Sequence, residues 1–414
     1  MKSPFFSIII PTRNRYSTLP YAIKTVMLQD FEDFELIISD NSSPNQYMKP
    51  GDIHEFHTDS RIKCLRPENE LSMTDNWEFA IARSTGQYVI LFGDDDGLVK
   101  GALTIIHGII QLTNAPVLNW ARVEYNWPDR LPVEIANQMV IPYKAVTGMM
   151  SSESYIRKVI NYQADYRYLP MFYNSAVSRT LIETLRQKTG RVFNATIPDI
   201  YSGFALAHVS NRYLTIAYPF SINGVSGQSN GAAHESNKKE KKEEFLKLYD
   251  QSGIKWPAVI PEMYTSYLGI LEPYVQLTRF FPELLKNIPE KKMYKIIIDN
   301  IDGNSKEDIT VKISKILQTV ERDKPLFNWV KGYIQKTNPQ YKSIAFTSVK
   351  EKVGFDGSHL ILNASDFDLN NVYDVSIFIA KLFGKYKDRD FTRDAFQPLK
   401  KRIRKAAAII LRGI

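Results

Sequence analysis

The sequence predicts an α/β fold, in which a Rossmann-like, mixed but mostly parallel sheet is flanked by helices and followed by a mostly helical C-terminal region. Short apolar runs with high β-propensity alternate with helix-period segments in the first third of the chain, and two of the runs are nearly uninterrupted. Such runs are typical of parallel strands covered by helices on both faces. The length of 414 residues leaves room for a second region. We expect an α/β domain at 1–235 and a mostly helical region with a basic amphipathic tail at 236–414.

The strands of the first domain are predicted from their apolar, β-branched composition. In chain order they are Phe6 to Ile10, Glu35 to Ser39, Arg61 to Leu65, Tyr88 to Phe92, Val117 to Glu124, Met171 to Val177 and Tyr213 to Ile222. The segment Trp127 to Lys144 contains three prolines and little periodicity, so we expect a loop with a short strand there.

The helices are predicted from apolar residues that recur on one face. For example, Leu19, Ile23 and Val26 share one side of the first helix, and Gly86 suits the end of the second. In chain order the helices are Leu19 to Leu28, Thr74 to Arg83, Val99 to Thr113, Ser152 to Asn161, Thr180 to Lys188 and Asp199 to Val209. This alternation of strands and helices places ligands at the carboxyl ends of the strands.

Composition narrows the class of protein. Cys64 is the single cysteine, so the chain forms no internal disulfide and offers no thiolate cluster for zinc or iron–sulfur centres. A metal ion would have to be held by oxygen ligands. The N-terminus does not resemble a signal peptide, and no apolar run approaches the roughly 20 residues that span a bilayer. We therefore expect a cytoplasmic protein.

The net charge of +8 is concentrated at the C-terminus. Residues 381–414 contain 11 Lys and Arg against 3 Asp, whereas the other 380 residues contain 42 basic and 42 acidic residues. This distribution predicts no nucleic-acid partner. As a helix, the tail would place one apolar stripe between its cations, formed by Leu399, Ile403, Ala406, Ile410 and Ile414. Two interpretations stay open: the tail lies on an anionic membrane at its inner face, or it docks on the protein with its basic face in water.

Three consecutive carboxylates, Asp94 to Asp96, follow the strand at Tyr88 to Phe92. Carboxylates clustered at the end of a buried strand are typical of a site for a divalent cation, because their mutual repulsion favours a counter-ion. Pro11 to Asn14 follows the first strand and Asp40 to Ser43 the second. In a parallel sheet these three loops converge, so the sequence predicts one cleft that could hold a cation and a diphosphate.

These motifs resemble the family 2 glycosyltransferases, inverting enzymes with the GT-A fold, of the type that acts in polysaccharide and O-antigen biosynthesis. The motifs that carry the resemblance are Pro11 to Arg15, Leu36 to Ser43, Ala82 to Val89 and the Asp triplet, in this order. The resemblance covers about residues 5 to 231. It implies a nucleotide-sugar donor, a glycan or lipid-linked glycan acceptor, and Mn²⁺ or Mg²⁺ as cofactor.

The resemblance also implies roles for individual residues. Donor-binding residues would be Pro11, Thr12, Arg13, Asp40, Asn76, Asp94 and Asp95. Asp96 and Asp94 would hold the metal ion. Many members read Asp-x-Asp-Asp, whereas this chain has Gly93 in the first place, which leaves open which two of the three aspartates act. Asn76 also suits the first turn of its helix without any role in binding.

The catalytic base implied by the resemblance is a carboxylate about one hundred residues after the triplet, at a helix start. Asp199 fits this position, although aspartate is also a common helix cap. The Gly224 to Gly231 segment would lie near the acceptor, and His234 could add a late metal or phosphate contact. A Gln-x-x-Arg-Trp element, which processive members carry, does not occur in the sequence, so we expect one sugar per encounter.

Two other functions compete with this interpretation. A sugar nucleotidyltransferase also holds Mg²⁺ with carboxylates on a Rossmann-like sheet, but it usually has a glycine-rich phosphate loop after the first strand, and Pro11 to Asn14 contains no glycine. A non-catalytic nucleotide- or carbohydrate-binding module on the same fold would be expected to lack the base or the acidic cluster.

Overall fold

The computed structural model describes residues 3–43, 56, 58–142, 146–229, 252–263, 265–303, 305–337, 339 and 353–383. Within these ranges, twelve strands form one mixed sheet. They are β1 (Phe6–Thr12), β2 (Phe34–Asp40), β3 (Ile62–Leu65), β4 (Tyr88–Leu91), β5 (Gly97–Leu98), β6 (Val117–Asn126), β7 (Gln138–Pro142), β8 (Gly148–Ser151), β9 (Ser175–Ser178), β10 (Arg212–Val225), β11 (Gly354–Phe355) and β12 (His359–Asn363).

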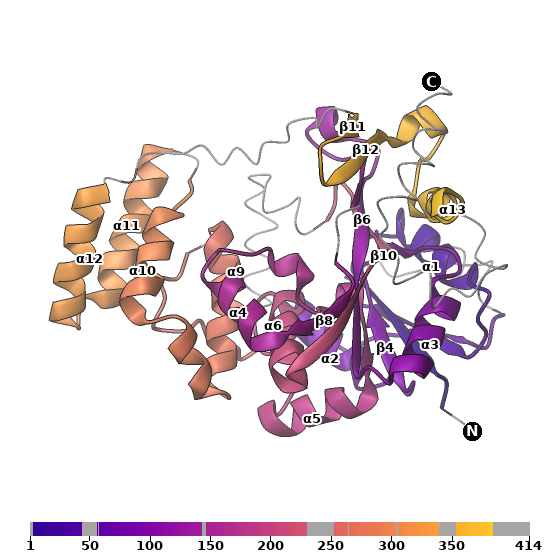
Figure 1. The fold of residues 1–414 in the computed structure, drawn as a ribbon, viewed down its shortest axis with the longest axis horizontal. Coiled ribbons are helices and arrows are strands. Elements are labelled where there is room, and N and C mark those ends of the chain that lie inside the picture. Colours follow the sequence, from indigo (N-terminus) through magenta and orange to yellow (C-terminus); the bar gives the residue numbers. More distant parts are fainter. Residues whose placement is uncertain are drawn as a thin grey trace.

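The helices cover both faces of this sheet and form a separate layer beyond it (Figure 1). They are α1 (Leu19–Met27), α2 (Met73–Ile81), α3 (Ala102–Thr113), α4 (Ser152–Ile160), α5 (Arg179–Thr189), α6 (Pro198–Ser210), α9 (Ser266–Thr278), α10 (Glu290–Asp299), α11 (Lys306–Val320), α12 (Lys324–Thr337) and α13 (Val372–Phe383). Short 3₁₀ turns lie at Val133–Ile135, Tyr166–Tyr168, Phe172–Asn174, Pro282–Asn287 and Ala364–Phe367.

The predicted fold class is confirmed. β1 pairs in parallel with β2 and β4, β2 pairs in parallel with β3, and β9 is antiparallel to both β4 and β6. The sheet is therefore mixed but parallel where the first βαβ units form it, as a GT-A fold requires. The three loops that follow β1, β2 and β4 lie at the same edge, because their strands run in the same direction.

One predicted strand needs local correction. The segment predicted as a strand at Met171 to Val177 is a 3₁₀ turn at Phe172–Asn174 followed by β9, because the chain bends there before it joins the sheet. The prediction of a loop with a short strand at Trp127 to Lys144 is confirmed, since β7 is that strand, and the loop before it contains the 3₁₀ turn Val133–Ile135.

The C-terminal region is helical over α9 to α12, but its last described part returns to the sheet. β12 pairs antiparallel with β7 and extends the sheet at that edge. α13 lies beside α1. The colours of the two helices in Figure 1 show that they come from opposite ends of the sequence. The Ser376 hydroxyl donates a 2.8 Å hydrogen bond to the Leu98 carbonyl oxygen, which ties α13 to β5. Residues 354–383 therefore complete the N-terminal sheet, while the division at 235/236 stays a prediction.

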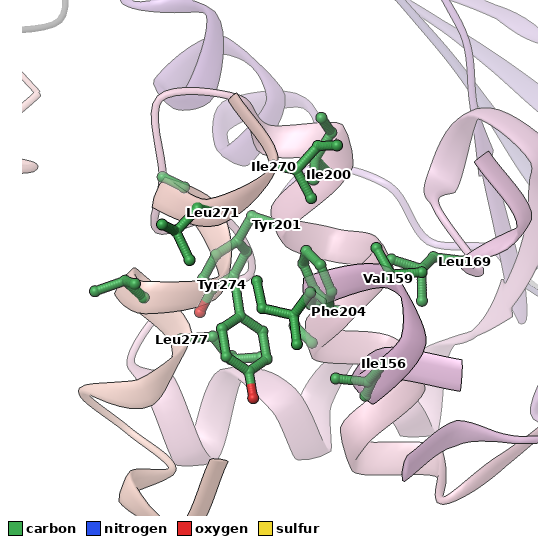
Figure 2. Close-up of a cluster of buried hydrophobic side chains, with 14 of the residues drawn as sticks. Ile156, Val159, Leu169, Ile200, Tyr201, Phe204, Ile270, Leu271, Tyr274 and Leu277 are labelled. Atoms are coloured by element: carbon green, nitrogen blue, oxygen red, sulfur yellow. The ribbon is translucent and has the colours of Figure 1, made fainter. Parts of the chain in front are cut away.

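An apolar core joins the helical layer to the sheet domain. Side chains of α4, α6 and α9 interlock in it, and Figure 2 labels Phe204 and Tyr274 near its centre. The two rings lie 5.1 Å apart in an edge-to-face arrangement, and Tyr274 donates a 2.7 Å hydrogen bond to the Leu284 carbonyl oxygen. Because these side chains are fully buried, α6 is held between the sheet and the helical layer.

Candidate active site

Asp94 joins the ends of two strands. Its Oδ2 accepts a 2.6 Å hydrogen bond from the Thr12 hydroxyl, at the end of β1, and its Oδ1 accepts a 3.1 Å bond from Arg15. The residue is 2% exposed, so these bonds take the place of water. The predicted convergence of the loops after β1 and β4 is therefore observed.

Asp95 is held by the end of β10. Its Oδ2 accepts hydrogen bonds from the Ser226 hydroxyl at 2.7 Å and from the Ser226 backbone N–H at 3.2 Å. The indole N–H of Trp127 donates to the Asp95 carbonyl oxygen at 2.9 Å. These contacts fix the loop and leave the other carboxylate oxygen of Asp95 at 3.9 Å from Arg15.

Asp96 is held by two backbone N–H groups. Gly224 donates to Oδ1 and Gly93 donates to Oδ2, both at 2.7 Å. A Cβ atom at position 224 would collide with the Asp95 carbonyl oxygen, and one at position 93 would lie 3.0 Å from Asp96 Oδ2. Gly224 is therefore required by the close approach of the Asp95 backbone. At Gly93 the near atoms are the carboxylate side chains of Asp95 and Asp96, which would have to shift to make room for a Cβ atom. The Gly93 N–H is a partner of Asp96.

Burial has the largest effect on the pKa values of Asp94 and Asp96. It raises the pKa of Asp96 to about 8 and that of Asp94 to about 6, and the neighbouring charge of Asp95 adds to both shifts. The Arg15 cation opposes the shift of Asp94. Such crowded carboxylates are stabilised by a cation, which makes the donor set of Asp94 and Asp96 suitable for Mn²⁺ or Mg²⁺. Across the described ranges, however, no three His, Cys, Asp or Glu side chains form a group that could hold a metal ion.

Asp40 lies at the end of β2, opposite Thr12 in the strand register. It accepts hydrogen bonds from Tyr16 at 3.0 Å and from Arg66 at 2.9 Å. Burial acts to raise the pKa of Asp40, but hydrogen bonds from Ser42, Arg66 and Tyr16 outweigh it and lower the pKa. Arg66 also lines a cavity of about 480 Å³ beside β3. The buried Asp40 is therefore joined through Arg66 to a cavity that Asp40 itself does not line.

The remaining predicted donor-binding residues make contacts within the protein. Arg13 donates to the Asn41 carbonyl oxygen at 3.1 Å and to Glu70 at 2.9 Å. Asn76 accepts a 2.7 Å hydrogen bond from the Ser39 hydroxyl and so joins α2 to the end of β2. Pro11 is opposite Ser39 in the pairing of β1 with β2. All three surround the predicted cleft, and their roles toward a donor stay predictions.

Asp199 lies in the first turn of α6, after Pro198 at the helix start. Backbone N–H groups of a first turn are free to bond a carboxylate and favour negative charge. Burial nevertheless raises the pKa of Asp199 above its usual value, against the hydrogen bond from the Ile200 N–H and the positive charge of Arg122. The result is a carboxylate that is a stronger proton acceptor than one in water.

Two residues that the sequence did not single out connect Asp199 with the triplet. The Tyr173 ring lies beside Trp77, and burial raises the Tyr173 pKa well above its usual value, with contributions from Asp96 and Asp199. Arg122, on β6, is close enough to both Asp96 and Asp199 to lower their pKa values. Neither side chain is part of a recognisable motif, so only the fold could reveal them.

The Gly224 to Gly231 segment was expected near the acceptor. Its described part, through residue 229, lies against the aspartate triplet, as the contacts of Gly224 and Ser226 show. His234 and the basic tail from residue 384 onward lie outside the described residues.

Comparison with known proteins places this chain beside glycosyltransferases in sequence. Residues 7–175 match the family described as Glycosyl transferase family 2. The chain is 35% identical over 105 residues to the GalNAc(5)-diNAcBac-PP-undecaprenol beta-1,3-glucosyltransferase of Campylobacter jejuni, a segment that covers 25% of this chain and 33% of that protein. It is 29% identical over 100 residues to a PGL/p-HBAD biosynthesis glycosyltransferase of Mycobacterium bovis, which covers 24% of this chain and 39% of the relative. The chain thus spans less than two fifths of the length of these relatives.

Among solved structures, S. aureus TarS 1-349 in complex with UDP-GlcNAc is similar to this chain. The similarity covers 86% of this chain and 96% of the TarS chain. The sequence identity is 14% and the TM-score is 0.46.

Proposed function

We propose, on the premise that residues 7–175 match the Glycosyl transferase family 2, that the protein transfers a sugar from a nucleotide-diphosphate donor to a glycan or lipid-linked glycan, with inversion and one sugar per encounter. The observation that carries the proposal is the hydrogen bond between Thr12 and Asp94, beside Asp40 at the neighbouring strand end. It supports a single cleft at the carboxyl ends of β1, β2 and β4, where ligands bind in open α/β sheets.

The nucleotide end of the donor is assigned to the Asp40 side of the cleft. The lowered pKa keeps Asp40 ionised at neutral pH, so it can accept hydrogen bonds from the N–H groups of a base or from ribose hydroxyls. The cavity lined by Arg66 offers space for the base, and a guanidinium stacks well on a planar ring. Pro11, Thr12, Arg13 and Asn76 form the neighbouring wall in this proposal.

Asp96 and Asp94 are assigned to a Mn²⁺ or Mg²⁺ ion, with Asp95 holding the loop. Mg²⁺ is commonly bound by one or two carboxylates together with substrate phosphates and water, so a third protein carboxylate is not needed. When bound, the ion would neutralise the diphosphate and make it a better leaving group. The raised pKa values of the two carboxylates support the need for such a counter-charge.

Asp199 is assigned the role of general base. It would take the proton of the acceptor hydroxyl while the hydroxyl oxygen bonds to the anomeric carbon and the bond from that carbon to the diphosphate oxygen breaks. The electron pair of the broken bond stays on the diphosphate. Arg122 and Tyr173 would lie between the leaving diphosphate and Asp199, where a cation and a hydroxyl can stabilise developing negative charge.

The acceptor is proposed by analogy with the Campylobacter relative, whose name describes a substrate linked to undecaprenol through a diphosphate. Such an acceptor would place the protein at the inner face of a membrane. In the described part of the chain, no helix has both the length and the apolar character that crossing a membrane requires. Contact with the membrane through the basic tail stays a prediction.

Thermal unfolding with nucleotide sugars tests the proposal. A ligand that binds the folded state raises the unfolding midpoint. We expect one class among UDP, GDP, CDP and dTDP sugars to raise the midpoint in the presence of Mn²⁺. The products then distinguish the three functions. A glycosyltransferase releases a nucleoside diphosphate, whereas a nucleotidyltransferase would release pyrophosphate or a nucleoside triphosphate. A binding module would release no product. If no nucleotide raises the midpoint, the donor site is wrongly assigned.

A further inference from the structure

A second cavity lies away from the donor cleft, between the sheet domain and the helical layer. Its volume is about 480 Å³, and its walls come from the C-terminal half of α4 and the start of α10 with the turn before it. Four cationic side chains line it: Arg157, Lys158, Lys286 and Lys292. We call this the basic cavity.

The positive charge of the basic cavity is largely uncompensated. No Asp or Glu is among the residues that line it. Lys286 lies 3.3 Å from Glu153, an exposed pair that contributes little. Among the described residues, no carboxylate lies within ion-pairing distance of Arg157, Lys158 or Lys292. Three cations that face one hollow without partners favour an anionic ligand.

A buried amide beneath the cavity holds the end of α4 against the turn before α10. Asn161 is 8% exposed, and its Nδ2 donates to the carbonyl oxygens of Arg157 at 2.6 Å and of Asn287 at 3.2 Å. Its Oδ1 has no partner, which is costly for a buried polar atom. This amide therefore fixes the backbone beneath the cations, while its own unpartnered oxygen is closed off from the cavity.

The walls of the cavity are held in place before any ligand binds. Ile156 and Val159 of α4 pack in the buried cluster shown in Figure 2, together with Tyr274 of α9. Tyr274 in turn accepts a 3.0 Å hydrogen bond from Asn287, which lines the cavity. The backbone positions that carry the four exposed cations therefore keep their spacing.

A short segment connects the basic cavity with the acceptor side of the active site. Asn161 lines the cavity, and Tyr166 lies close enough to Asp199 for its pKa to be raised by that charge in addition to burial. Asn161 and Tyr166 are five positions apart in the sequence, which corresponds to at most about 18 Å of extended chain. One acceptor molecule of a few sugar units could therefore reach both places.

We propose that the basic cavity binds a phosphate group of the glycan acceptor while the acceptor hydroxyl is presented to Asp199. This inference rests on the proposed function and gives the acceptor a chemical class, a phosphate-bearing glycan. The cations line a hollow and not a flat or convex face, which favours a compact phosphate over a membrane surface. The small volume excludes a nucleic-acid duplex.

The test measures binding of inorganic pyrophosphate by titration calorimetry in EDTA. Without a metal ion the carboxylates of the donor cleft repel pyrophosphate, so the basic cavity is examined separately. Lys158→Glu with Lys292→Glu reverses two exposed cations of the cavity. Lys306→Glu with Lys331→Glu makes the same charge change at exposed positions of α11 and α12. We expect at least ten-fold weaker binding in the first variant and wild-type binding in the second. Equal affinity in all three proteins, or none in the wild type, would overturn the proposal.

Two further arms identify the source of the phosphate. Glucose 1-phosphate should bind the wild type more tightly than inorganic phosphate, because its sugar hydroxyls can bond to the polar side chains of Ser154 and Gln163 that line the cavity. Equal binding would indicate a site for free phosphate. Phosphatidylglycerol vesicles should bind both variants equally, and a loss confined to the cavity variant would indicate a membrane surface. Hydrolysis of a nucleotide sugar by the wild type needs no acceptor. Its failure would reject the proposed function while leaving the pyrophosphate result intact.

Discussion

The backbone N–H of Gly224 donates a 2.7 Å hydrogen bond to Oδ1 of Asp96, which joins the end of β10 to the acidic loop after β4. Gly224 has space for no side chain there, because a Cβ atom would collide with the Asp95 carbonyl oxygen. We expect Gly224→Ala to displace the loop, to destabilise the protein by about 1–3 kcal/mol and to impair metal-dependent donor binding. Urea unfolding and nucleotide titration measure the two effects.

A matched control is Gly332→Ala, in α12. A Cβ atom at that position meets nothing within 4 Å, and alanine is the better helix former by roughly 1 kcal/mol. This variant should be as stable as the wild type or more stable, with unchanged nucleotide binding. Similar behaviour of the two variants would show that the backbone of Gly224 does not hold the acidic loop.

Asp199→Asn tests the assignment of the base. Asparagine fits the same place in the first turn of α6 but cannot take a proton, so we expect kcat for transfer to fall by about 10²–10⁴-fold while the affinity for the nucleotide is retained. Initial rates of transfer and equilibrium titration of the nucleotide give the two quantities. Retention of more than a tenth of the wild-type kcat would mean that another group accepts the proton.

Arg122→Gln tests the cation between the donor and acceptor sides. The positive charge of Arg122 lowers the pKa of Asp199, so its removal should raise that pKa and move the acidic limb of the kcat profile to higher pH. We also expect kcat at neutral pH to fall at least ten-fold. Arg212→Gln, at an exposed position of β10, is the control and should leave the profile in place. If the acidic limb stays in place in Arg122→Gln, then the charge of Arg122 does not act on the catalytic carboxylate.

Glu272 links the helical layer to the loop before Asp199. It is 1% exposed on α9 and accepts a 2.9 Å hydrogen bond from the Thr196 hydroxyl and another from Gln276. Burial raises the pKa of Glu272 to about 7 despite these bonds. The folded state therefore holds a proton that the unfolded state releases near pH 4.5, so this contribution to stability is present below pH 4.5 and is lost as the pH rises through 7.

Glu272→Gln removes this titration while keeping an oxygen that can face Thr196. Relative to the variant, the wild type should lose about 1–3 kcal/mol of unfolding free energy between pH 5 and pH 8. Urea unfolding at a series of pH values measures the difference. A constant difference across that range would show that Glu272 is already ionised in the folded protein.

Much of the fold could be predicted because its elements have strong local signals. The apolar run at Phe6 to Ile10 and the one-sided helix at Leu19 to Leu28 appear as β1 and α1 with almost the predicted bounds. The return of the chain to the sheet at β12 could not be predicted, since it depends on pairing with β7, more than two hundred residues earlier in the sequence.

The candidate site likewise contains residues that could be predicted from the sequence and residues that could not. Thr12, Asp40 and Asp94 follow three predicted strands, so their convergence follows from the direction of those strands. Arg122 has no local signal, because a cation within a strand usually faces water. Gly224 lies in a segment expected only to approach the acceptor, and its contact with Asp96 depends on how β10 crosses the sheet.

The central claim is that Asp96 serves metal-dependent turnover of a nucleotide sugar. The direct measurement is the rate of nucleotide-sugar hydrolysis with Mn²⁺ for the wild type, Asp96→Asn and Asp33→Asn, an exposed aspartate just before β2, away from the carboxyl ends of the strands. We predict that Asp96→Asn lowers the rate at least 100-fold and that Asp33→Asn retains the wild-type rate. An unaltered rate in Asp96→Asn would contradict the account.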